Sequence, residues 1–162
     1  MKRSLFILLV AGLVGCGGSG GDGGDSSGST TTGSSSRVLV SDAISINEDQ
    51  YYAIGFSLNR NADVKTTVTV LDGPAIEGFL VSEREYNAWV TMTQGNQFTN
   101  VDLRYYPDLS ISPVATHHES KWGRLEQGTY YFILENTDYG STLPPINMLN
   151  DKTFVEYSIS VK

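Results

Sequence analysis

The sequence predicts an all-β fold: an antiparallel β-sandwich of about eight strands, of the jelly-roll type, after a signal peptide and a disordered linker. From residue 37 onward, apolar and polar side chains alternate in short segments rich in β-branched and aromatic residues. Asn, Asp, Gly and Pro separate these segments at short intervals. No long window has the 3.6-residue period of an amphipathic helix, although 82–90 allows one helical turn.

The first 15 residues have the pattern of a secretory signal peptide. Lys2 and Arg3 precede an apolar run over 5–14, which is too short to span a bilayer of about 30 Å as a helix. The run ends in Leu-Val-Gly-Cys, and this tetrapeptide resembles the lipobox of bacterial lipoproteins. The resemblance implies cleavage between Gly15 and Cys16 and attachment of a diacylglyceryl group to the Cys16 thiol.

Acylation of Cys16 would make the lipid bilayer the first partner of this chain. Two or more acyl chains anchor a protein stably, whereas a single chain holds it only marginally. The alternative is an ordinary secretory signal in which the cysteine is accidental. Cys16 is the only cysteine, so an intrachain disulfide is excluded. Gly17 follows it rather than aspartate, which by resemblance to enterobacterial lipoproteins favours the outer membrane if the cell has two membranes.

Residues 17–36 contain only Gly, Ser, Thr and Asp, and they cannot bury enough apolar area to fold. Such a tether has a root-mean-square span of about 25 Å and reaches roughly 65–70 Å when fully stretched. The predicted organisation is therefore a signal peptide over 1–15, a lipidated cysteine and disordered tether over 16–36, and a β-sandwich domain over 37–162.

The first half of the domain carries the clearest strand patterns. Segment 37–46 has short β-branched runs, and segment 50–58 places apolar side chains on one face. Segment 63–71 alternates valines with residues of the opposite face, and Asp-Gly-Pro at 72–74 predicts a turn. The expected inward set of these strands is Tyr52, Ile54, Phe56, Leu58, Val64, Val68 and Val70, and the outward set is Thr67, Thr69 and Leu71.

The second half predicts further short strands. They lie at 76–81, 86–92, 100–106, more weakly at 109–116, and at 129–136. A last strand over 153–161 closes the domain. Its expected core residues are Phe154, Tyr157, Ile159 and Val161.

Residues 122–136 match the pattern W-x-x-L-x-x-G-T-Y-x-x-x-x-x-N. The matching residues are Trp122, Leu125, Gly128, Thr129, Tyr130 and Asn136. This pattern resembles the pre-peptidase C-terminal (PPC-like) domains, which are small bacterial sandwiches found beside exported enzymes. Gly128 is expected in a turn with positive φ, Trp122 and Leu125 at one end of the core, and Asn136 at a strand end, bonded to the next loop. The resemblance implies an accessory, chaperone-like or binding role without catalysis.

A search for catalytic and metal-binding patterns yields no catalytic residue and no metal site. Zinc-protease and phosphate-loop motifs are missing from the sequence, and the letters G-x-S-x-G and G-x-G-x-x-G occur only within 15–28, where no strand precedes them as a nucleophile elbow or a dinucleotide site requires. His117 and His118 are neighbours, and on a strand they would point to opposite faces, so we expect a solvated loop beside Trp122. Two carboxylate pairs, Glu83 with Glu85 and Glu48 with Asp49, are no evidence for glycoside hydrolysis, because sequence spacing does not show the cleft it requires and 18 acidic residues produce such pairs by chance.

No cofactor is expected, although two oxygen-rich loops, 47–50 and 136–140, leave structural calcium as a weak alternative to ordinary turns. The net charge of −7 and the pI near 4.7 disfavour nucleic acid as a partner, since no basic stripe interrupts the acidic composition.

The aromatic residues supply the candidates for ligand binding. Trp89, Trp122, Tyr105 and Tyr106 could offer exposed rings to a protein or a sugar, or could instead belong to the core. The sequence thus favours a non-catalytic, lipid-anchored envelope lipoprotein whose sandwich binds a protein partner. The alternative is a tethered carbohydrate-binding module that uses exposed Trp and Tyr to bind polysaccharide.

Overall fold

The computed structural model describes residues 35–95, 103–137, 139, 141 and 151–162. Contacts within the chain divide it into Met1–Ser35 and Ser36–Lys162, and every described helix and strand belongs to the second unit. The strands are β1 (Arg37–Asn47), β2 (Gln50–Leu58), β3 (Ala62–Asp72), β4 (Ile76–Ser82), β5 (Ile111–Val114), β6 (His117–Glu119), β7 (Gly123–Leu125), β8 (Gly128–Asn136) and β9 (Lys152–Val161). The helices are α1 (Glu83–Gly95) and the short 3₁₀ helix η1 (Pro107–Leu109).

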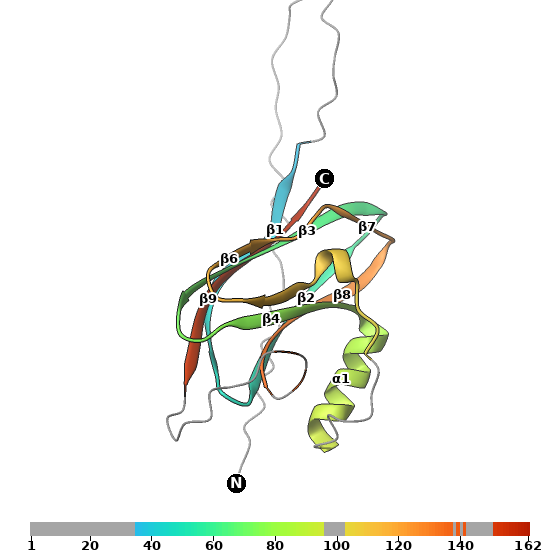
Figure 1. Cartoon of the computed structure of the whole chain (residues 1–162). Coiled ribbons are helices and arrows are strands. Elements are labelled where there is room, and N and C mark those ends of the chain that lie inside the picture. The colour runs from blue at the N-terminus through green and yellow to red at the C-terminus, as the bar shows by residue number, and fades with distance from the viewer. Residues whose placement is uncertain (1–34, 96–102, 138, 140, 142–150) are drawn as a thin grey trace, which may run out of the picture. The chain divides into compact units, whose positions relative to one another are not determined.

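Two antiparallel sheets pack against each other, which confirms the predicted all-β sandwich (Figure 1). One sheet has the order β1-β9-β3-β6, with β7 also paired to β3, and the other has the order β2-β8-β4-β5. The last strand, β9, lies between β1 and β3, so the two ends of the domain are joined within one sheet.

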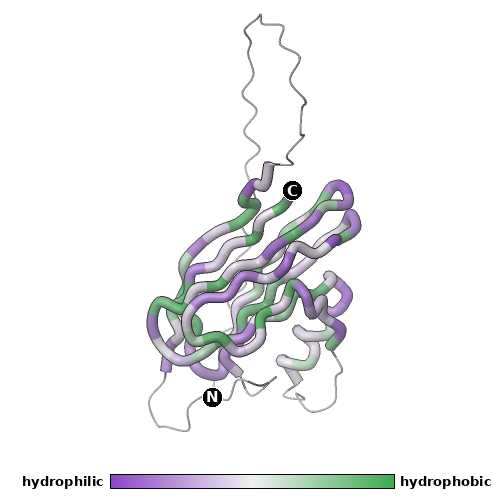
Figure 2. The backbone as a smooth tube through the Cα atoms, turned by 45° about the horizontal axis from the view of Figure 1, so that its top comes forward, coloured by the Kyte–Doolittle hydropathy of each residue, from purple (hydrophilic) through white to green (hydrophobic). Residues whose placement is uncertain are grey.

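The main core fills the space between the two sheets. Figure 2 shows hydropathy alternating along the strands, as expected where one face of a sheet is buried. The inward positions predicted for β2 and β3 are confirmed, and Thr66 joins them because its hydroxyl donates to the carbonyl of Leu109 at 2.8 Å. The fully buried members of this core include Val64, Val68, Ile76, Leu80, Phe132, Leu134, Val155 and Ile159.

In the middle of the four-stranded sheet, β4 and the second half of β8 are buried on the second face as well. Six consecutive residues of β4, 76–81, are buried, which alternation alone does not predict. Helix α1 and Leu103 cover this face against β4 and β8. The second core consists of Phe79, Val81, Trp89, Met92, Leu103 and Ile133.

Helix α1 occupies 83–95, so the strand predicted at 86–92 is wrong, and the single turn allowed at 82–90 is a longer helix. Ser82 caps it, because the backbone N–H of Glu85 donates to Ser82 Oγ at 3.4 Å. Ser82 and Glu85 thus have the spacing of a capping box, a signal visible in the sequence. Trp89 and Met92, three residues apart, then face the sheet.

The strand predicted at 100–106 is also wrong over its described part, since Leu103 to Tyr106 form no strand. Leu103 is buried in the second core, and the N–H of Tyr106 donates to the carbonyl of Leu80 at 2.9 Å. This segment therefore covers the part of the β4 edge that lies beyond the pairing with β5. Residues 100–102 lie outside the described part of the chain.

The inward face of β9 contains one error of prediction. Tyr157, Ile159 and Val161 are buried as expected, but Phe154 is 42% exposed and Val155 is fully buried in its place. Inward positions in a strand recur every second residue, so Phe154 cannot share a face with Tyr157.

Two glycines were expected to shape turns. The predicted turn at 72–74 is confirmed, and Gly73 has φ +95°, where a Cβ would clash with the carbonyl oxygen of Lys152. Gly128 also has the positive φ expected of it, +159°, but it is the first residue of β8 rather than part of a tight turn.

Replacing Phe132 with alanine should lower the free energy of unfolding by about 3–5 kcal/mol, because the ring is fully buried between the sheets. Phe154→Ala is the matched control and should cost less than about 1 kcal/mol, since this ring lies on the outer face. Urea unfolding followed by circular dichroism measures both. Equal losses would contradict the inward register of β8 and β9.

Candidate functional site

Trp89, one of the four aromatic candidates for ligand binding, belongs to the core instead. Its ring is completely buried beneath α1 and contacts Tyr51 and Tyr139 edge-on, with ring centroids 5.4 Å and 4.9 Å away. Phe79 lies 6.4 Å away on the same face of the sheet. Trp89 Nε1 has no hydrogen-bond partner among the described residues, and in this conformation the ring offers no surface to a ligand.

Tyr105 and Tyr106 are the most exposed of the candidates, at 44% and 37%. They are consecutive, and they pack on opposite sides of the β4 edge. The ring centroid of Tyr105 lies 5.3 Å from that of Phe79 in the second core, whereas the ring centroid of Tyr106 lies 5.9 Å from that of Tyr130 in the main core. Both rings are therefore held by rigid neighbours while part of each faces solvent.

Trp122 lies at one end of the five-stranded sheet, directly before β7, and is half-buried. The Nζ atoms of Lys162 and Lys65 lie 4.5 Å and 5.4 Å from the centroid of its indole ring, within cation–π range. Leu125, the other residue expected at the end of the core, is buried in the main core.

His117 and His118 belong to an edge strand, β6, so the loop predicted there is wrong. They are paired with consecutive residues of β3, and His117 shares a hydrogen bond of 2.8 Å between its Nδ1 and Thr69 Oγ1. His118 is opposite Val68, which faces the main core. The two imidazoles thus lie on opposite faces of the strand.

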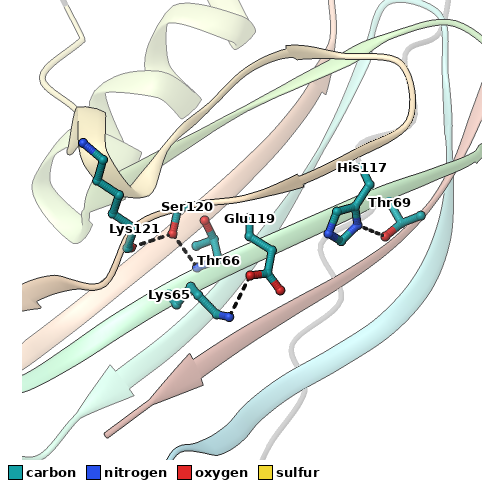
Figure 3. A network of polar contacts seen from close by, with 7 residues as sticks. All are labelled: Lys65, Thr66, Thr69, His117, Glu119, Ser120 and Lys121. Carbon is teal, nitrogen blue, oxygen red and sulfur yellow. Dashed lines mark hydrogen bonds and ion pairs between the residues drawn. The ribbon is translucent and has the colours of Figure 1, made fainter.

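Polar contacts fasten β6 to β3 (Figure 3). Lys65 Nζ pairs with Glu119 Oε2 at 3.0 Å, and the backbone N–H of Thr66 donates to Ser120 Oγ at 2.9 Å. Ser120 in turn donates to the carbonyl of Lys121 at 2.9 Å. The polar side chains at this edge of the sheet are therefore engaged in holding β6 against β3.

The carboxylate pairs singled out from the sequence do not form clefts. Glu83 and Glu85 lie in the first turn of α1, where negative charge is favourable, and Glu85 Oε2 accepts the N–H of Arg104 at 3.3 Å. Glu48 and Asp49 form the turn between β1 and β2, where Asp49 has φ +59°.

Within the described ranges, no group of three or more His, Cys, Asp or Glu side chains is placed to hold a metal ion. In loop 47–50, Asn47 Nδ2 donates to Gln50 Oε1 at 2.9 Å, as in an ordinary turn. Asn136 ends β8 as expected, but its fully buried side chain has no hydrogen-bond partner among the described residues. Residues 138 and 140 of the second oxygen-rich loop lie outside the described residues.

One buried pair, Glu77 and Glu135, is missed by the sequence analysis. The two residues are directly opposite each other in the β4–β8 ladder and are 3% and 0% exposed. Glu135 Oε2 accepts the N–H and the hydroxyl of Thr137 at 2.8 Å and 2.6 Å, and Glu77 Oε1 accepts the N–H of Ser141 at 2.7 Å. The pair thus ties residues that follow β8 to the second face of the sheet. The sequence signal for this pair was a glutamate in each of two otherwise apolar runs: Glu77 within 76–81 and Glu135 at the end of 130–135.

Burial raises the pKa of Glu135 from its usual value of 4.5 to about 9, and the nearby Glu77 adds to the rise. The hydrogen bonds from Thr137 act in the opposite direction but are outweighed. Glu135 is therefore protonated at neutral pH, which avoids a buried negative charge at this position.

Gly15 and Cys16, the predicted cleavage and lipidation residues, lie outside the described residues. In the described part of the chain, no helix combines the length and apolar character needed to cross a membrane. Neither a protein-family model nor a curated protein sequence matches this chain.

Glu135→Gln should flatten the pH dependence of stability. Because the pKa of Glu135 is about 9 in the folded state and near 4.5 when unfolded, the folded protein binds one more proton between these values. Its stability therefore falls as pH rises through this window, by up to about 1.4 kcal/mol per pH unit. Glutamine stays neutral and can still accept from Thr137, so the variant should lose most of this slope.

Urea unfolding at several pH values measures this slope. Glu156→Gln, on the exposed outer face of β9, is the control and should keep the wild-type slope. A Glu135→Gln variant with the wild-type slope would show that Glu135 does not carry the proton.

Proposed function

We propose that the chain is a lipid-anchored, non-catalytic lipoprotein of the bacterial cell envelope whose β-sandwich serves as a binding or accessory module for a protein partner. The observation that carries this proposal is the order of features along the chain. A basic and apolar leader ends in Gly15-Cys16, a tether of small polar residues follows, and a compact all-β domain comes next.

The anchor follows from the chemistry of Cys16. A thiol is the nucleophile needed for attachment of a diacylglyceryl group, and the small Gly15 gives a peptidase access to the bond before it. The tether of residues 17–36 lets the domain move away from the bilayer by tens of ångströms. Gly17 at the position after the cysteine favours the outer membrane.

The surface that best suits a protein partner is the β4 edge where Tyr105 and Tyr106 lie. Tyrosine combines a large apolar ring with a hydroxyl and has few rotatable bonds, so it contributes contact area at a low entropic cost. Both rings here are backed by buried neighbours, Phe79 and Tyr130, and they need little further ordering on binding.

A flat sugar-binding platform, the alternative function, needs rings that share one face. Tyr105 and Tyr106 pack on opposite sides of the β4 edge, and Trp89 is buried. Trp122 keeps partial exposure, but two lysine amines lie against its ring. These observations favour a protein over a polysaccharide as the ligand. The accessory role of the PPC-like domains, which the segment 122–136 resembles, agrees with this choice.

Cys16→Ser should release the protein from the membrane fraction of the producing cells, because serine has no thiol to acylate. We expect the wild-type chain to sediment with membranes after a high-salt wash and the variant to appear in the soluble fraction or to remain unprocessed. Ser27→Cys, within the tether, combined with Cys16→Ser is the control and should not restore retention. Membrane retention of a Cys16→Ser chain that has lost residues 1–15 would contradict lipid anchoring.

A photo-crosslinking residue at position 106 should capture a discrete protein partner in intact cells, because this position lies on the β4 edge. The same residue at position 71, which is 50% exposed on the other sheet, is the control and should give no such product. Products are compared by immunoblot and mass spectrometry. Equal products at both positions, or protection of position 106 by added polysaccharide, would contradict a protein-binding edge.

A further inference from the structure

Four basic residues lie at the same end of the five-stranded sheet: Arg37, Lys65, Arg124 and Lys162, here called the basic end. We propose that the basic end docks the domain onto the anionic phospholipid headgroups of the bilayer that holds its lipid anchor. This inference rests on the proposed function, since it assumes that Cys16 is acylated.

The register of the sheet brings these residues together. Arg37 of β1 is opposite Val161 of β9, and Val161 is opposite Val64 of β3, which is opposite Gly123 of β7. These pairs form one row across four strands. Each member of the basic end belongs to this row or is one residue away from a member of it.

The basic end contrasts with the acidic character of the chain, which has 18 Asp and Glu against 11 Lys and Arg. Arg37, Arg124 and Lys162 are exposed, whereas the Lys65 side chain is only 22% exposed. Arg60 and Lys121 lie in flanking turns and add positive charge, and Figure 3 shows the Lys121 amine well apart from that of Lys65.

Three acidic side chains partly offset this charge. Asp63 lies 3.6 Å from Arg124, Glu119 lies 3.0 Å from Lys65, and Glu126 lies between β7 and β8. Even so, six basic side chains stand against these three acidic ones and the α-carboxylate that Lys162 carries as the last residue of the chain, so the region keeps a positive balance.

The opposite end of the same sheet has the reverse balance. Lys152 pairs with Asn47 there, and four acidic residues surround this region. They are Glu48 and Asp49 in the β1–β2 turn, Asp72 at the end of β3, and Asp151 before β9. An anionic surface would therefore attract one end of the sandwich and repel the other, which orients the domain.

Two apolar groups at the basic end also suit a bilayer surface. Trp122 lies between Lys65 and Lys162, and tryptophan favours the headgroup region of membranes. Val38 is 58% exposed and follows Arg37. Basic residues beside a half-buried tryptophan and an exposed valine combine electrostatic attraction with shallow apolar contact.

The chain itself enters the domain at this end, because Arg37 is the first residue of β1. The tether from the anchored Cys16 therefore joins the sandwich at the face that would contact headgroups. Docking then needs no reversal of the chain, and the tether keeps the basic end at a high effective concentration near the bilayer.

Trp122 provides the readout for a test with the full lipidated chain. The protein is placed in phosphatidylcholine vesicles with or without phosphatidylglycerol, and its fluorescence is quenched with acrylamide. This quencher is neutral, so the charge of the vesicle does not change its local concentration. Trp89 is fully buried and gives a constant background, and Trp122→Phe measures that background.

We expect the quenching constant of Trp122 to fall about twofold or more in the phosphatidylglycerol vesicles, because docking shields the ring. About 1 M salt, where the screening length is about 3 Å, should reverse the change. Equal constants in the two kinds of vesicle would overturn the proposal. An anionic polysaccharide that protects Trp122 when phosphatidylglycerol does not would overturn the assignment to lipid.

The double variant Arg37→Gln, Arg124→Gln removes two basic side chains of the basic end and keeps Lys65 and Lys162 beside the Trp122 ring. Each basic side chain near an anionic surface strengthens binding roughly fivefold, so this double variant should weaken docking about 25-fold and restore quenching. Arg104→Gln combined with Lys152→Gln makes the same change of net charge elsewhere and should keep the protection. Equal behaviour of the two double variants would overturn the role of the basic end.

Flotation of the same samples separates this proposal from the proposed function. A chain that floats with pure phosphatidylcholine vesicles is held by its lipid anchor, and equal quenching then overturns docking alone. A chain that does not float with them lacks the anchor, which overturns the proposed function and the docking proposal that rests on it.

Discussion

The burial of β4 and the second half of β8, in the middle of the four-stranded sheet, on both faces is the constraint on which the rest of the structure depends. One face packs on the five-stranded sheet, and the other requires a cover that strands alone do not provide. Helix α1 and the segment around Leu103 supply this cover, and Trp89 is its largest buried side chain. The same burial places Glu135 in a region where a negative charge is costly, so Glu135 keeps its proton.

The sequence predicts the fold best where only one face of a strand is buried. The alternation of valines in β3 and of apolar residues in β2 identifies strand, face and register. Alternation is lost in β4, which is buried on both sides, and the inward face of β9 was misassigned at Phe154. In α1, the aromatic residues raised the strand propensity of 86–92, and the capping box of Ser82 and Glu85 was the stronger signal.

The candidate residues differ in how far sequence can locate them. The proposed lipidation of Cys16 rests on local sequence, because the resemblance to a lipobox needs only the residues beside the cysteine. Exposure of an aromatic ring depends instead on distant segments, and Trp89 and Trp122 could not be distinguished before their neighbours were known. The basic end was missed for the same reason: Arg37 and Lys162 stand at opposite ends of the domain sequence and meet only through the pairing of β1 with β9.

The central claim is that an acylated cysteine ties this sandwich to a bilayer, and the mass of the N-terminal peptide of the protein isolated from membranes tests it most directly. The account predicts a peptide that begins at Cys16, lacks residues 1–15 and carries the mass of a diacylglyceryl group, with one more acyl chain where the new amine is also modified. A peptide with an unmodified Cys16 thiol, or one that begins at another residue, would contradict the account.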